Sequence, residues 1–121
     1  VLRYDTEQDF LETPSWAAYD PGEHGVGTDP DGFATVVFDG RYVYFGPGFG
    51  ASGGREVLRY DTTAGFFTPS SWVTFDPQSQ GLGTWPTSFA GIVFDGRYIY
   101  FMPHTDLDIS TEVVLRYDTS A

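Results

Sequence analysis

The chain repeats itself at a fixed spacing, and this repetition limits the folds that it can adopt. The hexapeptide VLRYDT begins at positions 1, 57 and 114, and an offset of 56 residues also aligns SWAAYDP with SWVTFDP and VFDGRYVYF with VFDGRYIYF. About half of the aligned positions are identical, which indicates an internal duplication. The sequence therefore divides into a first repeat (1–56), a second repeat (57–113) and the start of a third (114–121).

Each repeat unit is predicted to contain four β-strands and no helix. Alternating apolar and polar residues, rich in β-branched and aromatic types, indicate strands at 33–39, 41–46, 57–61 and 71–76. Asp39-Gly40 and Asp95-Gly96 lie between such runs, a signal for tight hairpins in which both turn residues have positive φ. We therefore expect an all-β protein made of four-stranded antiparallel meanders.

The order FDGRYIYF, VLRYDT, Trp in a unit of this length resembles the blades of β-propellers of the kelch, YVTN or NHL type. The resemblance covers the whole chain, but its motifs assign no subfamily, because the WD-repeat signature and the kelch double glycine are absent. It implies blades that close into a ring only on oligomerisation or within a longer parent chain. Small residues at 34–35 and 90–91 suit an innermost strand near a ring axis. A two-sheet sandwich is the alternative fold.

The two ends of the chain are expected to supply incomplete blades. Residues 1–20 contain the third and fourth strands of a unit, whereas 88–119 contain the first, second and third. Copies that associate head to tail could complete each other, with one VLRYDT strand redundant. With two repeats per chain, a trimer would give six blades and a tetramer eight. The alternative is a segment of a longer tandem propeller.

Composition excludes several classes of partner and chemistry. The chain has 17 acidic and 6 basic residues, a formal charge of −11, no Cys and no Lys. We therefore expect no nucleic-acid partner and no anionic membrane surface, and the lack of a long apolar run predicts no membrane span. Without Cys there are no disulfides and no thiolate ligands. The acidity is also compatible with adaptation to high salt.

Ligand binding is expected in the connections on one face of the blades, at 46–56, 77–88 and 102–112, where the two copies differ most. Neutral drift of solvated loops is the alternative. The candidate ligand-binding residues are Trp85, His104, Asp106, Asp29 and Asp31. Trp85 suits stacking on a sugar ring, and simple packing is the alternative. Asp29 and Asp31, with Asp106 and Asp108, are weak Ca²⁺ candidates, because neither pair completes an EF-hand spacing, and solvated turn carboxylates are the alternative.

Residues that recur in the repeats are expected to hold the structure together rather than to react. They are Arg3, Asp5, Arg59, Asp61, Arg116, Asp118, Trp16, Trp72, Asp39, Gly40, Asp95 and Gly96. The charged ones favour cross-strand or interblade ties, and the Trp residues favour packing between blades. We expect no catalytic residue and no cofactor.

Three functions stay open. The first is a self-assembling binding module, lectin-like in its glycan recognition. The second is a purely structural unit that oligomerises to close the ring, and the last is an enzyme with a site at the ring axis.

Overall fold

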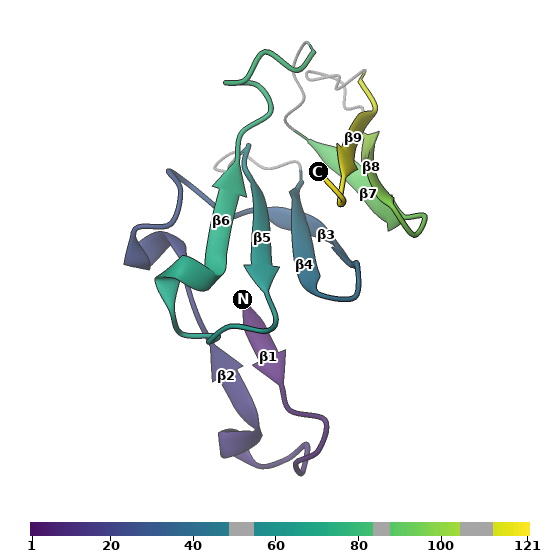
Figure 1. Cartoon of the computed structure of the whole chain (residues 1–121). Helices are drawn as coiled ribbons and strands as arrows, with labels where there is room; N and C mark the ends of the chain where they lie inside the picture. Colours follow the sequence, from purple (N-terminus) through teal and green to yellow (C-terminus); the bar gives the residue numbers. More distant parts are fainter. Residues whose placement is uncertain (49–54, 84–87, 105–112) are drawn as a thin grey trace.

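The computed structural model describes residues 1–48, 55–83, 88–104 and 113–121 and shows an all-β chain. Figure 1 shows three antiparallel sheets, with strand orders β1-β2, β3-β4-β5-β6 and β7-β8-β9. The strands are β1 Leu2–Tyr4, β2 Trp16–Ala18, β3 Phe33–Phe38, β4 Tyr42–Pro47, β5 Val57–Asp61, β6 Trp72–Phe75, β7 Phe89–Phe94, β8 Tyr98–Pro103 and β9 Leu115–Asp118. Short 3-10 turns lie at Thr13–Ser15, Gly22–His24 and Pro69–Ser71.

The predicted four-stranded antiparallel meander is confirmed in β3 to β6. Val36 pairs with Phe45, Phe45 with Leu58, and Leu58 with Thr74. The same register returns in β7 to β9, where Ile92 pairs with Phe101 and Phe101 with Leu115. Even the irregularity between Phe33 and Thr35 recurs, between Phe89 and Gly91. The duplication in the sequence is thus a duplication of strand register.

The prediction for the hairpin turn is wrong in one detail. The first pair that flanks the turn is Phe38 and Val43, and the Asp39 N–H donates to the carbonyl of Tyr42 at 3.1 Å. The two central residues are therefore Gly40 and Arg41 rather than Asp39 and Gly40. Gly40 has φ 105°, and glycine with positive φ at the first central position is typical of a type II′ turn. Asp39 Oδ1 instead accepts hydrogen bonds from the backbone N–H groups of Arg41 and Tyr42, at 2.9 and 2.7 Å.

The four-stranded sheet lies between the other two sheets, and each of its faces covers a different neighbour (Figure 1). Side chains alternate between the two faces of a strand. We name the face with Phe45, Leu58, Tyr60 and Trp72 the N-side face, because it packs against residues from the β1-β2 region. The opposite face, with Tyr44 and Val57, packs against β7 to β9 and is named the C-side face. The same two names apply to the corresponding faces of the other two sheets.

The described residues form two hydrophobic clusters, one at each junction between sheets. The first contains Tyr19, Val26, Leu58, Tyr60, Phe66 and Trp72. The second contains Tyr44, Val57, Phe89, Ile99 and Phe101. The sheets follow one another in chain order, and across the described residues they do not close on each other. The described segments contain no helix whose length and hydropathy would suit a membrane span.

Candidate functional site

The junction between the β1-β2 region and the four-stranded sheet is built from aromatic rings of both repeats. Tyr19 lies 5.7 Å from Trp72 and 6.0 Å from Phe66, centroid to centroid. Trp72 stacks on Tyr60 at 4.4 Å, and its indole N–H donates to the Phe66 carbonyl at 3.0 Å. The guanidinium of Arg3 lies 4.2 Å from the centre of the Phe66 ring. Apolar burial of several rings supplies most of the stability of such a junction.

The junction between β3–β6 and β7–β9 uses the opposite face in the same way. Tyr44, on the C-side face, packs in a cluster with Phe89, Ile99 and Phe101, and its ring lies 5.8 Å from Tyr117. At Gly46 an added Cβ would clash with Thr35 Oγ1 of the same sheet and would lie in ordinary contact with Ile92 and Phe101 of the next sheet. The N-side face of β7–β9 is therefore covered by the C-side face of the preceding sheet.

Two faces of these sheets are left open at the ends of the series. On the N-side face of β3, Val36 is 60% exposed and Phe38 54% exposed. Their counterparts one repeat later, Ile92 and Phe94, are partly buried against the second cluster. On the C-side face of β7–β9, Val93 and Met102 are exposed. Exposed apolar groups of this kind mark an interaction surface when they are contiguous.

A cleft of about 320 Å³ opens between the C-side face of β5–β6 and the edge of β9. Its lining is almost entirely apolar on one side, with Val73, Phe75 and Leu82. Leu115 and Tyr117 of β9 form the other side, and Arg59 lies at the junction. The sheet β7–β9 has no strand paired to the free edge of β9 among the described residues, and the cleft lies along that edge.

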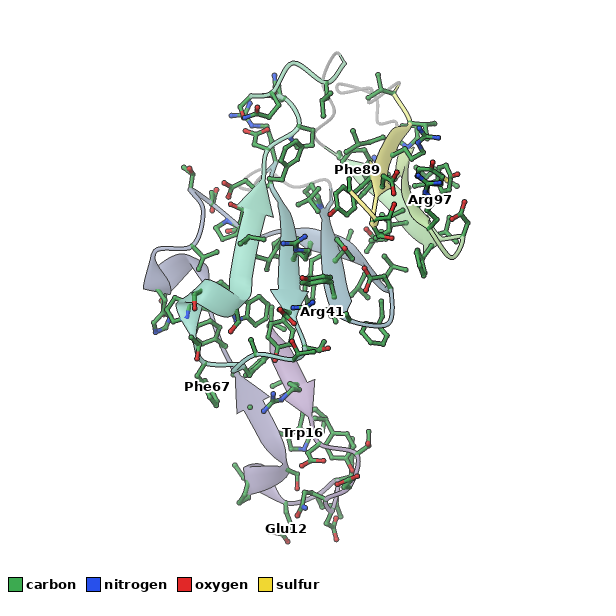
Figure 2. All side chains as sticks on the ribbon, in the orientation of Figure 1. Glu12, Trp16, Arg41, Phe67, Phe89 and Arg97 are labelled. Atoms are coloured by element: carbon green, nitrogen blue, oxygen red, sulfur yellow. The ribbon has the colours of Figure 1, made fainter. Side chains whose placement is uncertain are left out.

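Figure 2 shows that the β1-β2 hairpin and the β7–β9 sheet lie at opposite ends of the molecule. Trp16 projects from the hairpin, whereas Phe89 and Arg97 belong to the far sheet. On the hairpin, Trp16 contacts Tyr4 and Phe10 at 4.9 and 5.1 Å, centroid to centroid. Phe10 is 59% exposed, which shows that no second sheet of the described residues covers this small aromatic cluster.

Recurring charges form cross-strand ties at equivalent places in the two larger sheets. Arg41 pairs with Asp61 at 2.8 Å and Arg97 with Asp118 at 2.9 Å. The guanidinium that donates to each carboxyl lowers the pKa of Asp61 and of Asp118. Arg59 and Arg116 instead lie over tyrosine rings, 4.3 Å from Tyr42 and 4.2 Å from Tyr98. Exposed ion pairs of this kind add little stability but fix the register of neighbouring strands.

Asp39 and Tyr44 form a partly buried counterpart to these surface ties. The Tyr44 hydroxyl donates to Asp39 Oδ2 at 2.9 Å. Burial raises the pKa of Asp39, but the N–H groups of Tyr42 and Arg41 and the Tyr44 hydroxyl outweigh it, so the net shift is downward. Burial and the same hydrogen bond raise the pKa of Tyr44. The arrangement stabilises a carboxylate and a neutral phenol, and it returns at Asp95 and Tyr100 with a 3.0 Å bond.

Of the residues proposed for ligand binding, three fall within the described segments. Asp29 and Asp31 lie in an exposed connection, where the charge of Asp31 raises the pKa of Asp29. The N–H groups of Thr28 and Asp29 donate to Glu56. His104 is half-buried after β8, and its backbone N–H donates to the Ser88 carbonyl at 3.2 Å.

The other candidates, Trp85, Asp106 and Asp108, lie outside the described residues. Within the described segments, no group of three or more His, Cys, Asp or Glu side chains is placed to hold a metal ion. The expected glycan and Ca²⁺ sites therefore stay predictions from the sequence.

Sequence reasoning missed the open apolar residues, above all Phe10, Phe75 and Leu82. A signal for them was present. An offset of 56 residues places Phe10 on Phe66, and Phe75 and Leu82 on Tyr19 and Val26, and those three counterparts are buried together in the first cluster.

Comparison with protein-family models, with curated proteins and with solved structures found no match for this chain.

Proposed function

We propose that the chain is a self-assembling β-propeller fragment, in which each sheet is one blade and copies associate head to tail into a closed ring. The observation that carries the proposal is the repeated use of one interface. Inside the chain, the C-side face of β3–β6 covers the N-side face of β7–β9. The same two kinds of face are exposed at the ends of the series, at Val93 and Met102 and at Val36 and Phe38.

Because the strand register repeats, these exposed faces have the same backbone spacing as the two faces that pack against each other within the chain. A contact between unlike faces is heterologous and leads to a closed ring when its rotation completes a circle. Blades bury their faces only against neighbouring blades, so association removes exposed apolar area at both ends. With two repeats in each chain, three or four copies would give six or eight blades.

The substitution Phe38→Asp tests this proposal. Phe38 is half-exposed in the single chain, so the change should leave the fold intact, yet a carboxylate would be placed in the contact between copies. Native mass spectrometry and light scattering on a size-exclusion column should give one discrete trimer or tetramer for the natural chain and a monomer for the variant.

Ser70→Asp is the matched control, because it adds the same charge at an exposed position of a 3-10 turn. It should retain the oligomer. A natural chain that stays monomeric up to high concentration, or that forms an open series of sizes, would contradict assembly into a ring.

A further inference from the structure

The first hydrophobic cluster consists of two halves that come from different repeats. Tyr19 and Val26 lie in the first repeat, whereas Leu58, Tyr60, Phe66 and Trp72 lie in the second. Their packing joins the end of β2 to the outer strands of the next sheet. This junction shows how β5 and β6 are covered by residues that follow β2 in the preceding repeat.

The chain carries a second, unpartnered version of each half. One repeat after Tyr19 and Val26 stand Phe75 and Leu82, which are 47% and 44% exposed and line the cleft. One repeat before Phe66 and Trp72 stand Phe10 and Trp16, of which Phe10 is 59% exposed against 5% for Phe66. In one molecule the β1-β2 hairpin, which carries Trp16, and the β7–β9 sheet, whose edge bounds the cleft, lie at opposite ends (Figure 2).

We infer that the cleft between β6 and β9 is the docking site for Phe10 and Trp16 of a second copy of this chain, whose β2 pairs as the fourth strand of the β7–β9 sheet. This inference rests on the proposed assembly and specifies its outer contact. The internal junction serves as its template. In the docked state Phe75 faces Phe10 and Trp16 of the second copy, as Tyr19 faces Phe66 and Trp72 within the chain.

The register of the new strand follows from the repeats. Within β5 and β6, Leu58 pairs with Thr74 and Tyr60 with Trp72, and within β1 and β2, Leu2 pairs with Ala18 and Tyr4 with Trp16. The strand beside β2 in the assembly carries the sequence LRYD whether it is β9 of the first copy or β1 of the second. Both alternatives place β2 and Trp16 at the same position, so the occupant of the cleft does not depend on which strand is displaced.

The chemistry of the cleft suits these side chains. The lining is apolar at Val73, Phe75 and Leu82, and the tyrosine ring of Tyr117 occupies the place that Tyr60 takes under Trp72. Arg59 corresponds to Arg3, which lies over the Phe66 ring. Arg59 places a guanidinium at the edge of the cleft, where it lies over the Tyr42 ring and donates to the Tyr117 hydroxyl at 3.4 Å, beside the position that the repeats give to the ring of Phe10.

The test uses two variants that damage opposite halves of one contact. Leu82→Asp places a carboxylate in the cleft, and Phe10→Asp places one on the hairpin. Both side chains are substantially exposed in the single chain, so circular dichroism and thermal unfolding should show folded proteins. Each variant alone should be monomeric in native mass spectrometry, with association weakened by about 100-fold or more, because an unpaired charge would be buried.

Mixing the two variants gives the decisive result. The intact hairpin of the Leu82→Asp chain can enter the intact cleft of the Phe10→Asp chain, and the remaining contact is damaged on both sides. The mixture should therefore stop at a heterodimer with one copy of each variant. Gln80→Asp is the matched control, because Gln80 is exposed two residues from Leu82 and does not line the cleft. It should assemble like the natural chain.

The outcomes separate this inference from the proposed ring. A natural chain that is monomeric would overturn both. An oligomer that persists in Leu82→Asp would overturn the docking site while leaving assembly intact. Failure of the mixture to form the heterodimer, with the natural chain oligomeric and Phe10→Asp folded, would overturn the pairing of cleft and hairpin.

Discussion

The same leucine occupies the same strand position in successive repeats, and we expect its truncation to have very different costs. Leu58 is 0% exposed in the middle of β5, whereas Leu2 in β1 is 65% exposed. Leu58→Ala removes three buried carbon atoms, which at about 0.8 kcal/mol each gives about 2.4 kcal/mol. The cavity left in a packed cluster raises the cost to roughly 3–5 kcal/mol.

For Leu2→Ala only about a third of the transfer free energy applies, and an open site leaves no cavity, so we expect about 0.8 kcal/mol in the single chain. Leu115, half-buried in β9, should fall between the two. For a domain of this size a loss of 1 kcal/mol lowers the Tm by roughly 3–5 °C, so Leu58→Ala should lower it by about 9–25 °C.

The comparison is made by urea and thermal unfolding, followed by circular dichroism, in a Leu82→Asp background, after sedimentation has been used to check that each variant is monomeric. Equal losses for Leu2→Ala and Leu58→Ala in verified monomers would refute the reasoning. That result would mean that the N-side face of β1 is buried in the single chain and is not open for contact with a second copy.

Four further outcomes follow from the packing and the charges. Tyr44→Phe should cost about 1.5 kcal/mol in urea unfolding, the low end for a hydrogen bond to a charged group, because it removes the bond to Asp39, and Tyr100→Phe should cost less. Gly46→Ala should destabilise by about 1–3 kcal/mol through overpacking, because its Cβ would clash with Thr35 Oγ1, whereas Gly91→Ala has open space and should be neutral or stabilising. The folded-state pKa is lowered for four carboxyl groups, those of Asp39, Asp61, Asp95 and Asp118. Their contribution to the free energy of unfolding is therefore fully present above the unfolded pKa of about 3.9 and is lost as pH falls from that value through the folded-state pKa. The raised pKa of Asp29 acts in the opposite direction. Urea midpoints at about pH 3 and pH 6 check that loss. Because each copy carries a charge of −11, added salt should strengthen assembly through apolar faces by screening repulsion, and a weakening measured by light scattering would indicate contacts made by ion pairs.

Much of the architecture could be predicted from the sequence, because alternation and repetition are local signals. The strands expected at 33–39 and 57–61 are β3 and β5 almost to the residue. The turn between β3 and β4 was predicted one residue too early. The Asp-Gly signal does not reveal that Asp39 uses its carboxylate to accept two backbone N–H groups, which moves the central pair to Gly40 and Arg41.

The open faces could not be predicted in the same way. Val36 and Ile92 occupy equivalent positions with nearly equal side chains, yet one is exposed and the other is partly buried. The difference depends on whether another sheet lies in front, which is a property of neighbours distant in the sequence. Likewise, the recurring charges predict cross-strand or interblade ties but do not tell which residues pair, and the structure shows that Asp61 pairs across strands with Arg41.

The contact between sheets within one chain and the proposed contact between two copies differ in entropy more than in chemistry. Between β2 and β3 the chain itself holds two sheets together, which corresponds to an effective concentration in the millimolar range for a short connection. A second copy has no such tether, and each open contact must offset the loss of translational and rotational freedom. Closure changes this balance, because the last contact in a ring forms between ends that are already joined through the other copies. Partly assembled species have one contact fewer than the number of copies, whereas a ring has as many contacts as copies. We therefore expect assembly to pass from monomer to complete ring with little intermediate. The mixture of Leu82→Asp and Phe10→Asp isolates one such contact, so its heterodimer should form but should dissociate at a higher protein concentration than the ring of the natural chain.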